Sequence, residues 1–397
     1  MPPAVRKTPM AGGIFAERGC KTMIIKNAKV FRADGRFEDG DVFIDGAYFA
    51  DASAGGVEID AGGCYAIPGL IDVHVHGCVG HDFSFANADE IAKMARYQAE
   101  NGVTAICPTT LTLPEAQLEQ ACRNIAACDA PGIAAIVGIH LEGPFISPHK
   151  AGAQNLAHIQ PPSIQMVERL QSAANGLVKF LSLAPEMPGA MELIDAFGGK
   201  IACSLAHTTA DYQLASEALK RGARHITHLF NAMPPLNHRD PGVIGAAMDS
   251  PHCNAELICD NVHIHPSVVR AAFGMFSDER IIMISDSVAA AGLGDGIYEI
   301  GGMAVSVQGS ISRLVEGGAI AGSVANLMQC VRTAVNQMDI PLAKAVKCAS
   351  VNPAKAIGVF DKHGSIEAGK YADLVLLNED LSIRSVFLRG KDLKEAY

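Results

Sequence analysis

His74 and His76 flank Val75 near the end of a β-branched, apolar run, IDVHVH. Side chains alternate between the two faces of a strand, so both imidazoles would point to the same side. Two neutral ring nitrogens on one face can bind one divalent ion. Taken alone, the pair could also be two histidines with ordinary hydrogen-bond partners or two exposed ones. Its interpretation therefore depends on the other polar residues of the chain.

Three further residues of metal-ligating type also close apolar runs. Glu142 ends the run AAIVGIHLE, and burying a carboxylate there is costly unless a cation lies beside it. A lone glutamate could instead form a salt bridge or cap a helix. His207 and His228 end two successive runs, so their side chains would meet if these runs are neighbouring parallel strands. With the histidine pair, these residues make a complete ligand set for a divalent ion.

Asp286 closes another apolar run, RIIMISD, and is a candidate proton carrier. A divalent cation lowers the pKa of its water toward neutrality, and a nearby carboxylate can accept the proton and later pass it to a departing nitrogen. Amide hydrolysis needs this second transfer because an amine anion is a poor leaving group. The alternative role is structural, with Asp286 holding a ligand histidine in place.

The elements that must position these residues are eight candidate strands separated by amphipathic helical patterns, for example at residues 87–102, 114–128 and 211–222. A parallel strand buried on both faces is expected to be apolar throughout, yet nearly every candidate strand ends in a polar residue. Barrel enzymes build their active sites at these carboxyl ends. We therefore predict the α/β class, with a (β/α)8 TIM-like barrel. The candidate strands are IDVHVH, VTAICPT, AAIVGIHLE, KFLSLAPE, IACSLAH, RHITHLF, AELICD and RIIMISD.

Both ends of the chain are rich in short strand patterns, which we expect to pair into a small β-sandwich domain. The predicted organisation has a flexible N-terminal extension and a barrel hydrolase domain enclosed by the two parts of the β domain. A Gly-rich, β-like segment at residues 298–322 is expected to be a loop insertion near the barrel mouth. The predicted bounds are 1–22 for the extension, 23–67 and 359–397 for the β domain, and 68–358 for the barrel.

Composition excludes several classes of partner. Of the 397 residues, 49% are hydrophobic and 19% charged, which favours a large core. The net charge of −10 and the lack of a basic run argue against nucleic acid as a partner. No apolar run reaches the length of a membrane span or a signal peptide core. Eleven cysteines without CxxC pairs favour a reducing, cytoplasmic location.

Several motifs, in order, resemble those of the N-acetylglucosamine-6-phosphate deacetylase family of the amidohydrolase superfamily. The resemblance extends from about Met23 to Arg389. It implies that the histidines and the glutamate described above bind metal, and that Asp286 takes a proton from metal-bound water. The motifs are PGLIDVHVHG, HLEGPF, AHT, THLFNAM and ISDS.

The same resemblance implies a site for a phosphorylated sugar. Asn231 and Ala232 would donate hydrogen bonds to it, and Arg239 would clamp the phosphate, acting across a subunit interface if the family's usual oligomers form. The planar guanidinium fork matches phosphate oxygens.

Three further positions follow from the resemblance. His263 is expected to line the sugar site, next to Asn261, where the family usually has a small residue. Ala321 lies in a turn that contacts substrate. Gln154 stands where some relatives carry a histidine that contacts the acetyl group.

The predicted function is hydrolysis of the N-acetyl amide of N-acetylglucosamine 6-phosphate by a metal-activated hydroxide, giving glucosamine 6-phosphate and acetate. Zinc, iron and cobalt all suit the ligand set, with one or two ions per subunit, and Glu142 would bridge two ions. We expect a homodimer or homotetramer. Alternatives are the N-acetylgalactosamine 6-phosphate reaction, another N-acyl amidohydrolase and, from a different class, a barrel that serves as a non-catalytic scaffold. The complete ligand set with an additional acid argues against the scaffold.

Overall fold

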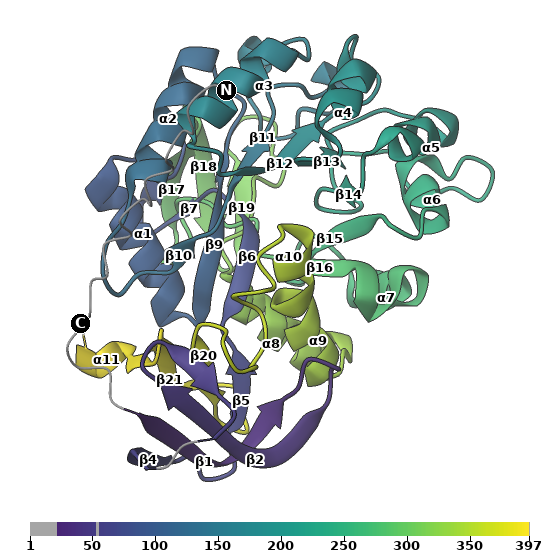
Figure 1. Ribbon diagram of the computed structural model, residues 1–397. Coiled ribbons are helices and arrows are strands. Elements are labelled where there is room, and N and C mark those ends of the chain that lie inside the picture. Colours follow the sequence, from purple (N-terminus) through teal and green to yellow (C-terminus); the bar gives the residue numbers. More distant parts are fainter. Residues whose placement is uncertain (1–21, 53–54, 397) are drawn as a thin grey trace, which may run out of the picture.

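The structure is a computed structural model that describes residues 22–52 and 55–396. The predicted N-terminal extension therefore lies outside the described residues, apart from Thr22. A large barrel surrounded by helices occupies most of the molecule, and a smaller sheet lies at one end of it (Figure 1).

Eight parallel strands form the barrel, and each pairs with the next one along the chain. A parallel bridge between Val75 and Ser287 joins the last strand segment to the first. Nearly every residue in these strands is buried, as expected for strands covered on both faces. The predicted (β/α)8 barrel is confirmed. Its strands are β6 (Leu70–Val75), β9 (Val103–Thr110), β11 (Ile139–Glu142), β12 (Val178–Leu183), β13 (Ala202–Leu205), β14 (His225–Ile226), β15 (Asn254–Ile258) and β16 (Ile281–Ile284).

At least one helix follows each barrel strand. The Asn87 side chain accepts hydrogen bonds at the start of α1, and Asp211 caps α5, which ends at Gly222 in a conformation with φ of 125°. These ends agree with the sequence prediction. The helices are α1 (Ala88–Glu100), α2 (Glu115–Ala127), α3 (Ile164–Ala173), α4 (Ala190–Phe197), α5 (Tyr212–Arg221), α6 (Gly242–Asp249), α7 (Pro266–Arg280) and α8 (Leu327–Met338).

Strands from both ends of the chain form one further sheet with a small hydrophobic core of its own. β20 runs antiparallel to β5, so the two ends pair as predicted, and the purple and yellow strands lie side by side in Figure 1. The domain boundaries at 67/68 and 358/359 stay predictions. The strands are β1 (Met23–Phe31), β2 (Phe37–Asp45), β3 (Tyr48–Ala50), β4 (Val57–Asp60), β5 (Tyr65–Pro68), β20 (Leu374–Leu377), β21 (Ile383–Leu388) and β22 (Lys391–Asp392).

The Gly-rich insertion between β16 and α8 forms a three-stranded antiparallel sheet rather than an irregular loop. The turn that follows this sheet lines the pocket described below, so the predicted location near the barrel mouth is correct. Its strands are β17 (Gly296–Ile300), β18 (Met303–Gln308) and β19 (Ile311–Leu314).

The remaining short elements connect these layers. None of the helices in the described ranges is long and apolar enough to span a membrane. The short elements are β7 (Gly77–Cys78), β8 (His81–Asp82), β10 (Ala135–Ile136), the 3-10 turns Pro148–Lys150 and Leu156–His158, α9 (Leu342–Ala349), α10 (Val351–Ala356) and α11 (Leu393–Ala396).

Candidate metal centre and pocket

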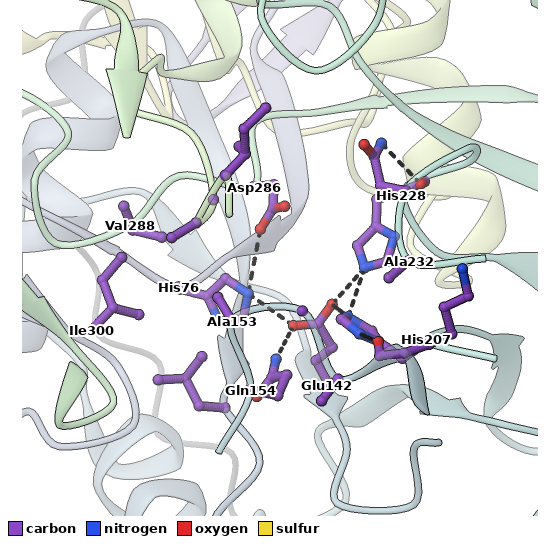
Figure 2. Close-up of a pocket in the computed structure, with 18 of the residues that line it drawn as sticks. His76, Glu142, Ala153, Gln154, His207, His228, Ala232, Asp286, Val288 and Ile300 are labelled. Atoms are coloured by element: carbon purple, nitrogen blue, oxygen red, sulfur yellow. Dashed lines mark hydrogen bonds and ion pairs between the residues drawn. The ribbon is translucent and has the colours of Figure 1, made fainter. Parts of the chain in front are cut away.

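The carboxyl ends of the barrel strands surround a pocket with a cavity volume of about 340 Å³. Five of the six residues predicted as metal ligands or proton carrier converge in Figure 2, with Asp286 and Glu142 among them. The fold thus brings together side chains that lie more than 200 residues apart in the chain. Those that line the pocket are His76, Glu142, His207, His228 and Asp286, and His74 lies directly beneath, fully buried.

One triangle of donor atoms joins the first and the last barrel strand. The Nε2 atoms of His74 and His76 are 3.3 Å apart, and each is 3.4 Å from Oδ1 of Asp286. All three side chains are buried or nearly so. Because the three atoms are equally spaced and point at one another, they can coordinate a single ion.

A second triangle consists of Glu142, His207 and His228. Oε1 of Glu142 lies 3.3 Å from Nε2 of His207 and 2.9 Å from Nε2 of His228, and the two nitrogens are 3.0 Å apart. These atoms come from the ends of β11, β13 and β14, and β12 lies between the first two of these strands. This group is also a candidate for holding a metal ion.

The spacing within both triangles fits metal coordination. Ligands about 2.0–2.1 Å from a tetrahedral ion lie roughly 3.3 Å from one another. Two imidazole nitrogens without a hydrogen between them do not attract each other, so the close Nε2 pairs are best explained as ligands directed at a common cation. The residues present therefore fit a divalent metal ion.

Glu142 links the two triangles. Its Oε1 is 3.4 Å from Nε2 of His74, and its Oε2 is 3.1 Å from Nε2 of His76. Gln154 fixes the carboxylate, because its amide nitrogen donates to Oε2 over 2.7 Å while its oxygen accepts from the backbone N–H of Thr112. The Gln154 amide is thus committed to Glu142 in this structure.

Both pocket carboxyls are held in the ionised form. Burial would raise the pKa of Glu142, but the surrounding imidazoles hold it well below its usual range. Burial likewise opposes ionisation of Asp286, yet His74 and His76 lower the pKa of its carboxyl. Burial of His76 would lower the pKa of its imidazole, but its hydrogen bonds to Asp286 and Glu142 raise that pKa to about 9. Ionised carboxylates are the form that binds cations and accepts protons.

A second layer of side chains holds the ligand histidines from below. Glu256, buried in the middle of β15, accepts hydrogen bonds from Nδ1 of His74, from Nε2 of His225 and from the backbone N–H of His228. His207 donates from Nδ1 to the carbonyl of Lys150 over 2.8 Å. Because the Nδ1 atoms of His74 and His207 act as donors, their Nε2 lone pairs face the cluster.

The backbone is also unusual where the strands end. His207, His228 and Asp286 all have positive φ angles, of 43°, 33° and 50°. Residues other than glycine seldom adopt this conformation, and it is found most often where the surrounding structure enforces it for function. Each of these residues follows a straight barrel strand and turns its side chain into the mouth.

The residues predicted to bind substrate fall into two groups. Gln154, Asn231, Ala232, His263 and Ala321 all line the pocket. Arg239 does not: it is exposed on the loop between β14 and α6, away from the pocket lining of its own chain.

His263 is held in the pocket by a strand-end acid. Nδ1 of His263 is 2.7 Å from Oδ2 of Asp260, and burial of the ring, which lowers its pKa, is outweighed by this carboxylate, so that the pKa is raised. The intervening Asn261 has a φ of 66°, which asparagine tolerates better than most residues. A small residue is therefore not required at this position.

Sequence reasoning missed two residues that the structure brings into the site. Glu256 lies inside its apolar run, so attention to strand ends passed over it, although a charge within a buried strand is itself a signal. Lys150 lines the pocket from a short 3-10 turn for which the sequence pattern offered no indication.

Comparison with known proteins agrees with this geometry. A model of the amidohydrolase family matches residues 65–393. The chain is 38% identical over 330 residues to N-acetylglucosamine-6-phosphate deacetylase of Bacillus subtilis, which covers 82% of this chain and 83% of the relative. It is 32% identical over 385 residues to the Homo sapiens protein of the same name, with 93% of each chain covered.

Solved structures give the same result. A variant of N-acetyl-D-glucosamine-6-phosphate deacetylase from Mycobacterium smegmatis, in complex with N-acetyl-D-glucosamine-6-phosphate, superposes with a TM-score of 0.87 at 30% identity. The match covers 94% of this chain and all of that one. The family predicted from the motifs is confirmed.

Proposed function

Since the chain belongs to the amidohydrolase family, and within it to the N-acetylglucosamine-6-phosphate deacetylases, we propose that it hydrolyses the N-acetyl amide of N-acetylglucosamine 6-phosphate. The products are glucosamine 6-phosphate and acetate. The observation that carries the proposal is the pair of ligand triangles, linked by Glu142 and facing a pocket in which Asp286 is ionised.

Two groups of residues would hold divalent ions. Glu142, His207 and His228 would hold one, and His74, His76 and Asp286 would hold another, with Glu142 between them. When bound, such an ion lowers the pKa of the attacking water and polarises the acetamido carbonyl. Zinc, iron and cobalt all suit imidazole and carboxylate ligands, and a two-ion site is the arrangement that the two triangles favour.

The residues of the chain move the protons. Asp286 accepts a proton from the attacking water and then delivers it to the sugar nitrogen as the amide C–N bond breaks. Its ionised state and its place 3.4 Å from both histidine nitrogens suit the first step. Gln154 keeps the Glu142 carboxylate from rotating, which supports a positioning role rather than contact with the acetyl group.

The substrate would be held by other residues that line the pocket. Asn231 and Ala232 line the pocket and would contact the phosphorylated sugar, while His263 and Ala321 line the same cavity. Arg239 would reach a phosphate only from a neighbouring subunit, because it is exposed and does not line its own pocket. This supports a homodimer or homotetramer.

We also propose a cytoplasmic enzyme that acts on a small amino sugar phosphate, without nucleic acid or membrane partners. The described cysteines are free and nearly all buried, which suits a reducing compartment.

Acetate release from a panel of N-acetylated sugars tests the proposal. The purified chain is loaded in turn with zinc, iron(II) and cobalt(II), and is offered the gluco and galacto epimers, each with and without the 6-phosphate. We expect the highest kcat/KM with N-acetylglucosamine 6-phosphate. Release of no acetate from any of these sugars would refute the proposal. A higher kcat/KM with the galacto epimer would favour the alternative substrate, N-acetylgalactosamine 6-phosphate.

A further inference from the structure

The pocket contains a single cationic side chain of the lysine or arginine type among the described residues, namely Lys150. Lys150 is half-buried, and its Nζ donates to the backbone carbonyl of Met233 over 3.4 Å. Met233 directly follows Asn231 and Ala232, so the ammonium group lies against the wall that would receive the sugar phosphate.

The Lys150 ammonium is not neutralised by the protein. Within the described residues it forms no ion pair, and its one recorded side-chain contact is the Met233 carbonyl. The pocket carboxylates Glu142 and Asp286 are both engaged by histidines. A cation that lines a cavity and has no carboxylate partner is suited to an anionic ligand.

We propose that Lys150 binds the 6-phosphate of the substrate within its own subunit, and so determines the preference for phosphorylated sugars. The inference rests on the proposed function. Since Arg239 lies outside the pocket of its own chain, Lys150 is the one lysine or arginine side chain that the described residues supply to that pocket. Its ammonium group would donate hydrogen bonds to the phosphate oxygens next to Asn231 and Ala232.

The backbone and the side chain of Lys150 make different contacts, so the side chain can be substituted without removing the backbone contact. The backbone carbonyl oxygen accepts the hydrogen bond from Nδ1 of His207. Substitution of the side chain leaves this carbonyl in place, so an effect on phosphate recognition can be separated from an effect on the metal ligands.

The test compares Lys150→Met, which keeps the length of the side chain, with Lys150→Arg, which keeps the charge. The measured quantity is the ratio of kcat/KM for N-acetylglucosamine 6-phosphate to that for N-acetylglucosamine. We expect Lys150→Met to lower this ratio about 10- to 100-fold, mainly through KM for the phosphorylated sugar, which is the usual size of a lost charged hydrogen bond. Lys150→Arg should restore most of it.

Lys200→Met is the matched control, because Lys200 is exposed and precedes β13 at the opposite end of the barrel. It removes the same charge and should leave the ratio unchanged. Arg239→Ala, measured in parallel, shows how much Arg239 of a neighbouring subunit contributes to the same kcat/KM ratio. If Lys150→Met keeps the wild-type ratio while its metal content and unfolding temperature are normal, the proposal is wrong.

Inorganic phosphate provides a second measurement that does not depend on turnover. Its dissociation constant from the metal-loaded protein, measured by calorimetry, should rise in Lys150→Met and stay near the wild-type value in Lys150→Arg. If the wild type releases no acetate from any sugar, the proposed function fails, yet this comparison still decides whether Lys150 binds phosphate. Equal phosphate affinity in the wild type and Lys150→Met would overturn the inference.

Discussion

Glu256 illustrates how a residue below the pocket can control the residues within it. Its carboxylate accepts a hydrogen bond from Nδ1 of His74, which turns the other ring nitrogen toward the metal cluster. It also accepts hydrogen bonds from Nε2 of His225 and from the backbone N–H of His228, so one buried acid supports both ligand triangles. Burial would raise its pKa, but the histidines, His74 foremost, hold it well below the usual value. It therefore stays an acceptor of hydrogen bonds.

We expect Glu256→Gln to weaken metal binding rather than to abolish the chemistry. The amide has a similar shape but only one acceptor oxygen for three donors, so the His74 ring loses its fixed orientation. Loss of such a supporting contact typically costs 10- to 100-fold in metal affinity. Metal titration by calorimetry measures this, and kcat should recover at high metal concentration. The exposed Glu192→Gln on α4 is the control, and unchanged metal affinity in Glu256→Gln would contradict the positioning role.

Asp286→Asn tests proton transfer while one of the two ligand triangles stays intact. The variant keeps the shape of the side chain but cannot accept a proton, so we expect kcat to fall about 10²- to 10⁴-fold, the usual contribution of a general acid–base group. The Glu142, His207 and His228 triangle is untouched, and elemental analysis should still find bound metal. Near-normal turnover would remove Asp286 from the mechanism.

Polar residues at strand ends indicated the candidate ligands and Asp286, because a polar side chain that ends an apolar run is visible in the sequence. The partners of those groups were not predictable by that rule. Glu256 lies within its strand, and Lys150 belongs to a short turn whose place is set by the tertiary structure. The separation of Arg239 from its own pocket was implied by the family resemblance alone, since sequence spacing does not give the direction of a loop.

At the scale of elements, the eight barrel strands were predictable because each one is a buried apolar run separated from the next by a helix. The structure of the insertion after β16 was less predictable. Its glycines and alternating pattern indicated β structure, but pairing of β17, β18 and β19 into one sheet depends on contacts that sequence order does not reveal. The turn after β19 matters most for the site, since Ser323 donates to the carbonyl of Asp286.

Gly322 in this turn should be sensitive to a single methyl group. Its φ is 59°, and an added Cβ would overlap Cγ1 of Val288 and approach the Asp286 carbonyl oxygen to 3.1 Å. We expect Gly322→Ala to lower the free energy of unfolding by about 1–3 kcal/mol and to reduce kcat, because the backbone that carries Asp286 must shift. Thermal unfolding and acetate release measure the two effects.

Gly302→Ala is the matched control for this substitution. Gly302 has a φ of 84° in the turn between β17 and β18, but a Cβ there meets no atom within 4 Å. The Gly302→Ala variant should have the same kind of backbone strain but no steric clash, so its kcat should stay close to that of the wild type. An equal loss of kcat in both variants would mean that strain in the insertion, rather than contact with the Asp286 segment, causes the effect.

At the scale of the whole molecule, the terminal sheet brings the two ends of the chain together through β5 and β20, and the barrel is joined between its first and last strands beside the candidate metal site. Asp286 donates its backbone N–H to the carbonyl of His74 over 3.0 Å, and Val75 bridges Ser287. The pairing of the chain ends was visible in their strand patterns. That the seam of the barrel lies next to the ligands could not be seen, because it depends on the strand register.

Metal removal should therefore destabilise the barrel as a whole. The ligands come from five of its strands, including both sides of the seam, and an ion that binds only the folded chain stabilises it by about 2.7 kcal/mol at 100 times its dissociation constant. For a chain of this size that corresponds to roughly 3 °C in unfolding temperature. Differential scanning calorimetry of the metal-loaded protein before and after chelation measures the shift, and restoring the metal should reverse it. His263→Asn, which alters the pocket but not the triangles, should keep the shift, whereas His228→Asn should lose the part of it that comes from the Glu142, His207 and His228 triangle, because that ion then has only two ligands from the protein. Identical unfolding temperatures with and without metal would show that the ligand cluster does not bind an ion in the folded barrel.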